Sequence, residues 1–187
     1  GTIELLNRQE LKSTSTAQLK SEIKSILDDN KRIIASKKLI ITKNIANNVR
    51  IGLSAELVGV LLRTNLENAF EIADKNGRVD VKIIQTGSKV KLSIAGGGKA
   101  LSRRMLHALE IPIKNARNLD AVGAGLYLNQ IIVESVGGKF AIASDSKTGT
   151  YVNIKLPKSN ADVNNFKPNT ELENPELAPF KGKAKLA

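Results

Sequence analysis

The chain has 187 residues, a net charge of +11 from 29 basic and 18 acidic side chains, and 41% hydrophobic residues. It contains no cysteine and only one histidine, His107, which excludes a disulfide framework, a thiolate metal centre and a histidine-rich metal site. No apolar run reaches the roughly 18 residues of a membrane span. The lysines are scattered and aromatic residues make up only 3%, so a solvated basic surface is favoured over a nucleic-acid interface.

The first part of the chain predicts two helices separated by a strand. Ser15 and Gln18 have the spacing of a capping box, and apolar residues follow at helical spacing over residues 19–34. A β-rich run at residues 38–42 predicts a strand. Ser54 then precedes a second amphipathic segment, for which it can act as the N-cap.

The second part of the chain predicts more strands and a third helix. Two strands at residues 79–85 and 90–95 are joined by a short turn, a helix is expected over residues 126–136, and two final strands are expected at residues 139–144 and 151–156. The predicted fold class is α/β (α+β). It is a two-layer sandwich, a mixed sheet of about five strands covered on one face by three helices.

The composition changes after Pro157. Residues 158–187 are rich in Pro, Asn and Lys and show no apolar periodicity. Such a segment cannot bury enough apolar surface to fold, so it predicts a flexible tail.

Glycines occur at two places where a phosphate or another ligand could approach the backbone. Gly123 and Gly125 precede the third predicted helix, and backbone N–H groups at a helix start attract anions. Residues 96–98 are three consecutive glycines directly after a predicted strand, where the chain can turn tightly or meet a ligand closely. At both places the alternative is a purely structural turn.

Asn68 is the main polar candidate on the second predicted helix. Thr64 lies one turn before it on the same helix face. An amide oxygen in that position could hold Mg²⁺ together with phosphate oxygens and water. The alternative is an amide that hydrogen-bonds a neighbouring loop.

Taken in order, these segments resemble the ATP-binding catalytic domain of sensor histidine kinases, in the superfamily shared with gyrase and mismatch-repair ATPases. The resemblance covers residues 10–157 and is strongest over residues 123–157, which read Gly-Ala-Gly-Leu, Glu-Ser-Val-Gly-Gly, Gly-Thr and Leu-Pro in turn. It implies that residues 1–9 end a preceding helical dimerisation segment. The family's phospho-accepting histidine lies on that segment, so His107 is expected to be an ordinary residue.

The resemblance assigns nucleotide-binding roles by position. Asn68 matches the Mg²⁺-binding asparagine, Gly98 the first glycine of the Asp-x-Gly-x-Gly box, and Thr150 a threonine near the adenine. Gly123, Gly125 and the adjoining Leu126 match the phosphate loop. No catalytic residue is assigned within the chain.

Several positions depart from the family pattern. Gly96, or Ala95 if the register slips by one, replaces the aspartate that accepts a hydrogen bond from the adenine amine. Loss of such a bond costs about 1.5–3 kcal/mol, or roughly ten- to a hundredfold in affinity. Ala100 replaces the box's second glycine, and Glu71 stands where a basic residue is usual. The lid at residues 101–120 lacks the usual Phe pair.

These departures lead to two hypotheses. The first is a histidine-kinase-like ATP-binding domain in two-component or phosphorelay signalling, whose degenerate site binds nucleotide weakly or not at all. The alternative is an active Mg-ATP-dependent domain that phosphorylates a histidine on the dimerisation domain. Mg-ATP is therefore the candidate ligand, and enzymatic activity stays open. A basic nucleic-acid binder unrelated to ATP is a third and weaker hypothesis.

The resemblance also implies partners and a location. The expected partners are a histidine-bearing dimerisation domain or a response regulator, with the parent protein a homodimer and no nucleic acid involved. The expected location is cytoplasmic, either alone or as the cytoplasmic part of a membrane sensor.

Overall fold

The computed structural model describes residues 13–98, 100–101, 106, 121–145 and 149–159. Five strands form one sheet in the order β2-β4-β5-β7-β6, in which β2 and β4 are parallel and the other neighbours are antiparallel. These strands are β2 (Ile40–Ile45), β4 (Arg78–Thr86), β5 (Lys89–Gly96), β6 (Lys139–Asp145) and β7 (Gly149–Pro157). A separate two-stranded sheet pairs β1 (Thr14–Ser15) with β3 (Arg50–Ile51).

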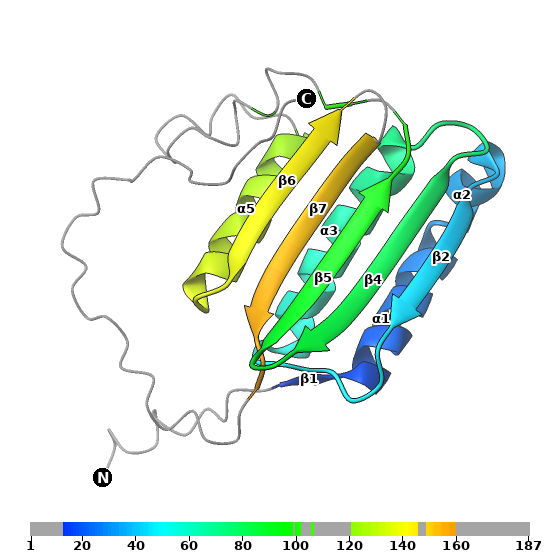
Figure 1. The fold of residues 1–187 in the computed structure, drawn as a ribbon. Coiled ribbons are helices and arrows are strands. Elements are labelled where there is room, and N and C mark those ends of the chain that lie inside the picture. The colour runs from blue at the N-terminus through cyan, green and yellow to red at the C-terminus, as the bar shows by residue number, and fades with distance from the viewer. Residues whose placement is uncertain (1–12, 99, 102–105, 107–120, 146–148, 160–187) are drawn as a thin grey trace, which may run out of the picture.

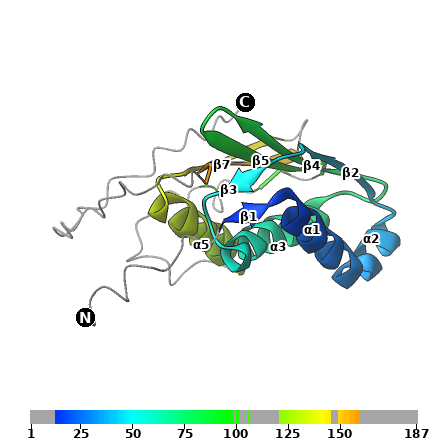
Figure 2. The same ribbon diagram turned by 90° about the horizontal axis from the view of Figure 1, so that it is seen from below.

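The helices lie together on one face of the five-stranded sheet (Figures 1 and 2). They are α1 (Thr16–Asp29), α2 (Lys31–Lys37), α3 (Ala55–Ile72) and α5 (Ala121–Ser135). The two-layer α+β class predicted from the sequence is confirmed. The described part of the chain contains four helices rather than three, because the first periodic segment is divided at Asn30. The Asn30 side chain donates to the Ile26 carbonyl at 2.9 Å, which ends α1 before α2 begins.

Two other predicted element boundaries differ from those in the structure. Lys38 ends α2 in the left-handed conformation with φ of 53°, so the strand begins at Ile40 instead of residue 38. The helix expected from residue 126 begins at Ala121 instead. The predicted caps are confirmed: Ser15 forms a capping box with Gln18, and the Ser54 hydroxyl accepts from the backbone N–H of Leu57 at 3.4 Å.

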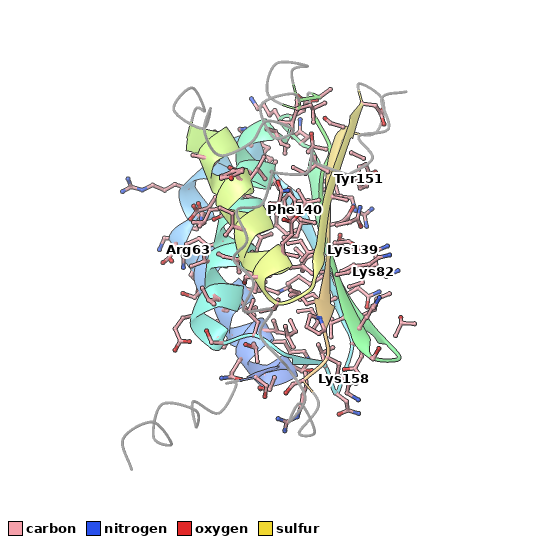
Figure 3. The ribbon with its side chains drawn as sticks, turned by 90° about the vertical axis from the view of Figure 1, so that its left-hand side faces the viewer. Arg63, Lys82, Lys139, Phe140, Tyr151 and Lys158 are labelled. Carbon is pink, nitrogen blue, oxygen red and sulfur yellow. The ribbon has the colours of Figure 1, made fainter. Side chains whose placement is uncertain are left out.

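The core lies between the helices and the sheet. Strand residues alternate, so that side chains such as Val81, Ile83 and Leu92 face the helices while their neighbours face solvent. Figure 3 shows Phe140 between the two layers, with Lys82 and Lys139 projecting from the open face of the sheet. The burial of one sheet face explains why the alternating strands could be recognised in the sequence.

The described chain continues two residues past the predicted start of the tail. The backbone N–H of Lys158 donates to the Ser88 carbonyl at 2.8 Å, and that of Ser159 donates to the Arg50 carbonyl at 3.2 Å. The first two residues of the predicted tail are therefore hydrogen-bonded to the folded domain. The rest of that tail, residues 160–187, and the predicted segment 1–9 lie outside the described residues.

The C-terminal end of α3 is held by a lysine from the preceding helix. The Lys37 ammonium donates to the backbone carbonyls of Phe70 at 3.0 Å and Ala73 at 3.1 Å, and to that of Glu71. Carbonyls at a helix end carry partial negative charge, which a cation stabilises. This contact fixes the end of α3 next to the candidate site described below.

Candidate functional site

A pocket opens between α3 and the β5–β7 part of the sheet. Most of its wall is apolar, and three polar side chains, all from α3 and β7, interrupt that wall. Apolar walls with a few fixed polar groups are typical of small-molecule sites, and this pocket is narrow. The pocket is lined by Asn65, Asn68, Ala69, Ile72, Ile94, Leu101, Leu126, Thr150 and Val152.

Helix α3 supplies two of the polar side chains, Asn65 and Asn68, which are three residues apart and so share a helix face. The Asn65 side chain is buried, and its Nδ2 donates to the Leu61 carbonyl at 2.7 Å. The Asn65 Oδ1 and the Asn68 Nδ2 are buried without a hydrogen-bond partner. Buried polar atoms without partners are costly, so these two atoms mark a place suited to a ligand.

Strand β7 supplies the third polar side chain, Thr150. Its Oγ1 lies 2.8 Å from the Ser144 Oγ of β6, and the backbone N–H of Leu101 donates to that Ser144 Oγ at 2.8 Å. Ser144 thus connects the strand pair to the segment after β5. This connection fixes both Leu101 and the Thr150 hydroxyl at the pocket wall.

Gly96 ends β5 directly opposite Thr150 in the sheet register. A Cβ at this position would lie 3.1 Å from the Ala69 carbonyl oxygen and 3.3 Å from its Cα. The end of the strand therefore approaches the backbone of α3 closely, and Ala69 itself lines the pocket. Position 96 offers no side-chain acceptor, and its surroundings leave little room for one.

The other predicted glycines have different local roles. A Cβ on Gly98 would lie 2.2 Å from the Ile72 carbonyl oxygen, so that glycine allows close packing against the end of α3. A Cβ on Gly125 would lie 2.8 Å from Thr64 Cγ2, so Gly125 allows α5 to approach α3. Gly123 and Gly125 both lie inside α5 instead of in a loop before it.

Of the predicted site residues, Asn68, Leu126 and Thr150 come together in the pocket, and Gly96 and Gly98 border it through their contacts with α3. Gly123 and Gly125 do not line the pocket. Glu71 is exposed and does not line it either. Of the lid predicted at residues 101–120, the structure describes Leu101, which lines the pocket, and Leu106, which is buried, while the other residues, including His107, lie outside the described part of the chain.

Tyr127, the residue after Leu126 on α5, has a phenol whose pKa is raised. Burial, as the larger cause, and the negative charge of Glu134 both raise the pKa of the Tyr127 phenol. The phenol is therefore neutral at physiological pH.

The donors at the site fit a magnesium nucleotide better than a metal alone. In the part of the chain that the structure describes, no three His, Cys, Asp or Glu side chains come together to hold a metal ion. Mg²⁺ is commonly held by few protein oxygens together with substrate phosphates and water. An amide oxygen such as that of Asn68 meets this requirement only when a phosphate ligand completes the coordination.

Sequence reasoning missed Asn65. The residue lies three positions before Asn68 on the same helix. The available signal was its polarity: Asn65 falls in a run of α3 whose neighbours Leu61, Leu62 and Leu66 are all buried. A polar residue among such neighbours must find a partner or a function.

Comparison with known protein families identifies the domain. The profile described as histidine kinase-, DNA gyrase B- and HSP90-like ATPase matches residues 55–160. The chain belongs to this family. The match includes α3, the pocket and all strands from β4 to β7.

Two curated relatives with similar sequences are named as sensor kinases. The chain is 31% identical over 101 residues to the sensor histidine kinase ZraS of Escherichia coli K12, covering 54% of this chain and 21% of ZraS. It is 28% identical over 102 residues to a probable C4-dicarboxylate sensor kinase of Halalkalibacterium halodurans, covering 54% of this chain and 19% of that protein. The chain thus spans about a fifth of the length of these relatives.

Solved structures show the same fold at lower identity. The nucleotide-free catalytic domain of the histidine kinase ThkA superposes with a TM-score of 0.63 at 18% identity, covering 78% of this chain and 94% of that one. The mycobacterial sensor histidine kinase MprB gives a TM-score of 0.61 at 18% identity, covering 79% and 97%. Within the described residues, no helix is both long and apolar enough to span a membrane.

Proposed function

We propose that this domain is the nucleotide-binding part of a two-component sensor kinase and that it binds Mg-ATP weakly. The observation that carries the proposal is the pocket itself, which brings Asn68, Leu126 and Thr150 together from three separate elements. Those are three of the positions that the family resemblance assigns to nucleotide binding. Membership of the ATPase family supports the same ligand.

Each pocket side chain has a defined task in this proposal. Asn68 offers an amide oxygen to a magnesium ion that the nucleotide's phosphates also coordinate. Leu126 and Ile94 provide apolar surface for the flat base, and the Thr150 hydroxyl faces its polar edge. When bound, Mg²⁺ supplies charge neutralisation for the phosphates.

The proposed weakness has its origin at Gly96. A charge-assisted hydrogen bond to a base amine contributes about 1.5–3 kcal/mol, and Gly96 can supply none. The exposed Glu71 adds a negative charge near the end of α3, although solvent screens much of its effect. We therefore expect a dissociation constant in the high-micromolar range.

Isothermal titration calorimetry with Mg-ATP tests the proposal directly. A high-micromolar dissociation constant is expected for the full chain, and Thr150→Val is expected to weaken it further because the hydroxyl is lost while the shape is kept. A low-micromolar constant would contradict the proposed weakness. Absence of binding at millimolar Mg-ATP would contradict nucleotide binding altogether.

An active kinase is the second candidate function. It is favoured by the retained Asn68 and by the relatives named as sensor kinases. In this case the domain would transfer phosphate from ATP to a histidine on a dimerisation domain, and the parent protein would be a homodimer. Incubation of the chain with [γ-³²P]ATP and such a histidine-bearing domain would distinguish activity from binding alone.

A response regulator is the proposed downstream partner. The support is a solved complex of the histidine kinase ThkA with the response regulator TrrA, whose kinase superposes on this chain with a TM-score of 0.61 at 17% identity. A cytoplasmic location, alone or as part of a membrane sensor, belongs to the same proposal.

A further inference from the structure

Asn65 has a polar atom that the fold itself does not use. The side chain is 1% exposed and lines the nucleotide pocket. Its Nδ2 is held by the Leu61 carbonyl at 2.7 Å, which sets the orientation of the amide. Its Oδ1 is buried and has no hydrogen-bond partner. The residue thus brings to the pocket wall an oriented acceptor that no other described group satisfies.

The same pocket is bordered by Gly96, which has no side-chain acceptor. Gly96 packs against Ala69, one helical turn after Asn65 on α3, and pairs with Thr150 across the sheet. Asn65 and Thr150 thus bring an amide oxygen and a hydroxyl to a pocket with otherwise mainly apolar walls. An amide oxygen accepts, while a hydroxyl can donate.

We propose that Asn65 Oδ1 accepts the hydrogen bond of the exocyclic amine of a 6-aminopurine nucleotide, in place of the side chain that Gly96 lacks. This inference rests on the proposed nucleotide function and adds a specificity-determining residue to it. A 6-aminopurine presents an amine donor next to a ring-nitrogen acceptor, which matches the Asn65 oxygen and the Thr150 hydroxyl. A neutral amide forms a weaker hydrogen bond than a carboxylate, which is consistent with weak binding.

The experiment compares two nucleotides that differ only in that amine. The full chain is titrated calorimetrically with Mg-ATP and with the magnesium complex of purine riboside triphosphate, which has hydrogen in place of the 6-amino group. Wild-type protein is expected to bind ATP about five- to tenfold more tightly, the range of one net hydrogen bond. Asn65→Leu and Asn65→Ala are expected to reduce this ratio below about twofold.

Asn129→Leu is the matched control. Asn129 is 0% exposed and both its amide atoms lack partners, yet it does not line the pocket. The control should keep the wild-type ratio. Asn65→Ala leaves the pocket open, so its ratio decides the result if the larger leucine blocks both nucleotides.

The outcomes separate the two proposals. A ratio near one in wild-type protein, or a ratio retained in both Asn65 variants, would overturn the role of Asn65 while nucleotide binding stands. Failure of wild-type protein to bind either nucleotide would overturn both. A ratio lost equally in Asn129→Leu would show that Asn65 has no specific role.

Discussion

The two contacts that α3 makes with its neighbouring helices are built differently. Against α1, the buried side chains are apolar, with Leu19, Ile23 and Ile26 between 0% and 1% exposed. Towards α5, Gly125 faces Thr64, and Asn129, one turn later on the same helix, is buried with two amide atoms that lack partners. The α1 contact therefore contributes stability, whereas the α5 side retains costly polar groups.

This difference coincides with the position of the pocket. Asn65, Asn68 and Leu126 line it, and the last of these belongs to α5. Proteins often retain destabilising groups where function needs them, while the rest of the core supplies the stability. The α1 contact would then support a less stable α5 side, and the following substitutions test this interpretation.

The largest effect is expected in the apolar contact. Ile23→Ala removes a side chain that is 1% exposed, so it should lower the free energy of unfolding by about 2–5 kcal/mol through lost burial and a cavity. Urea denaturation followed by circular dichroism measures the change. Leu57→Ala on α3, at a position 40% exposed, is the control and should cost much less. Equal losses would contradict the importance of the α1 contact.

A substitution at the strand end next to α3 should have the second-largest effect. Gly96→Asp restores the residue type of the family, but its Cβ would lie 3.1 Å from the Ala69 carbonyl oxygen. Overpacking of this kind costs about 1–3 kcal/mol, or roughly 2–12 °C in melting temperature for a chain of this size. A new acceptor would otherwise raise the Mg-ATP affinity at least tenfold. Because of the crowding at Ala69, we expect a smaller gain.

Gly97→Ala is the control for that prediction. A Cβ at position 97 would lie 3.6 Å from the Arg78 carbonyl oxygen, which is an ordinary contact. Its melting temperature should stay closer to that of the wild type than the Gly96→Asp value. A stable Gly96→Asp variant with tenfold tighter Mg-ATP binding would show that α3 yields at Ala69.

The third prediction concerns the contact between α3 and α5, where buried polar groups lie. Asn129→Leu keeps the branching at Cγ and removes two buried amide atoms without partners. The removed desolvation penalty is about 1–3 kcal/mol, from which overpacking by the larger leucine subtracts. A net stabilisation of about 1 kcal/mol is expected in thermal unfolding. Destabilisation would indicate that the Asn129 amide has a partner in solution, such as a buried water.

Sequence patterns predicted the layers of this fold better than its pocket. Period-two alternation revealed β4 to β7, because one face of the sheet is buried, and serine caps located α1 and α3. The break at Asn30 escaped prediction because apolar spacing continues through it. The start of α5 also escaped prediction, because its first turns contain glycines, which are poor helix formers.

The pocket was only partly predictable for a related reason. Asn68, Leu126 and Thr150 could be located because the family resemblance fixes their positions along the chain. The free acceptor of Asn65 depends on its bond to Leu61, and the restriction at Gly96 depends on the distance to Ala69. Both arise from three-dimensional packing between segments, which local sequence patterns do not contain.

The smallest effect is expected at the surface of the α1–α3 contact. The Arg63 guanidinium lies 3.0 Å from Asp29 Oδ2 and 3.8 Å from Glu22 Oε1 of α1, and 3.4 Å from Glu67 Oε1 on α3 itself. Figure 3 shows Arg63 on the outer side of the helical layer. Because all four side chains are at least one-third exposed, solvent screens their attraction and such pairs contribute about 0.2–1 kcal/mol each.

Arg63→Met, which keeps much of the aliphatic stem, should therefore lower stability by about 1 kcal/mol or less, and 0.5 M NaCl should reduce the difference from wild type. Paired urea titrations at low and high salt measure this difference in the free energy of unfolding. A loss of stability above about 2 kcal/mol that salt leaves unchanged would contradict the prediction. It would mean that packing of the arginine stem, rather than its charge, holds α1 against α3.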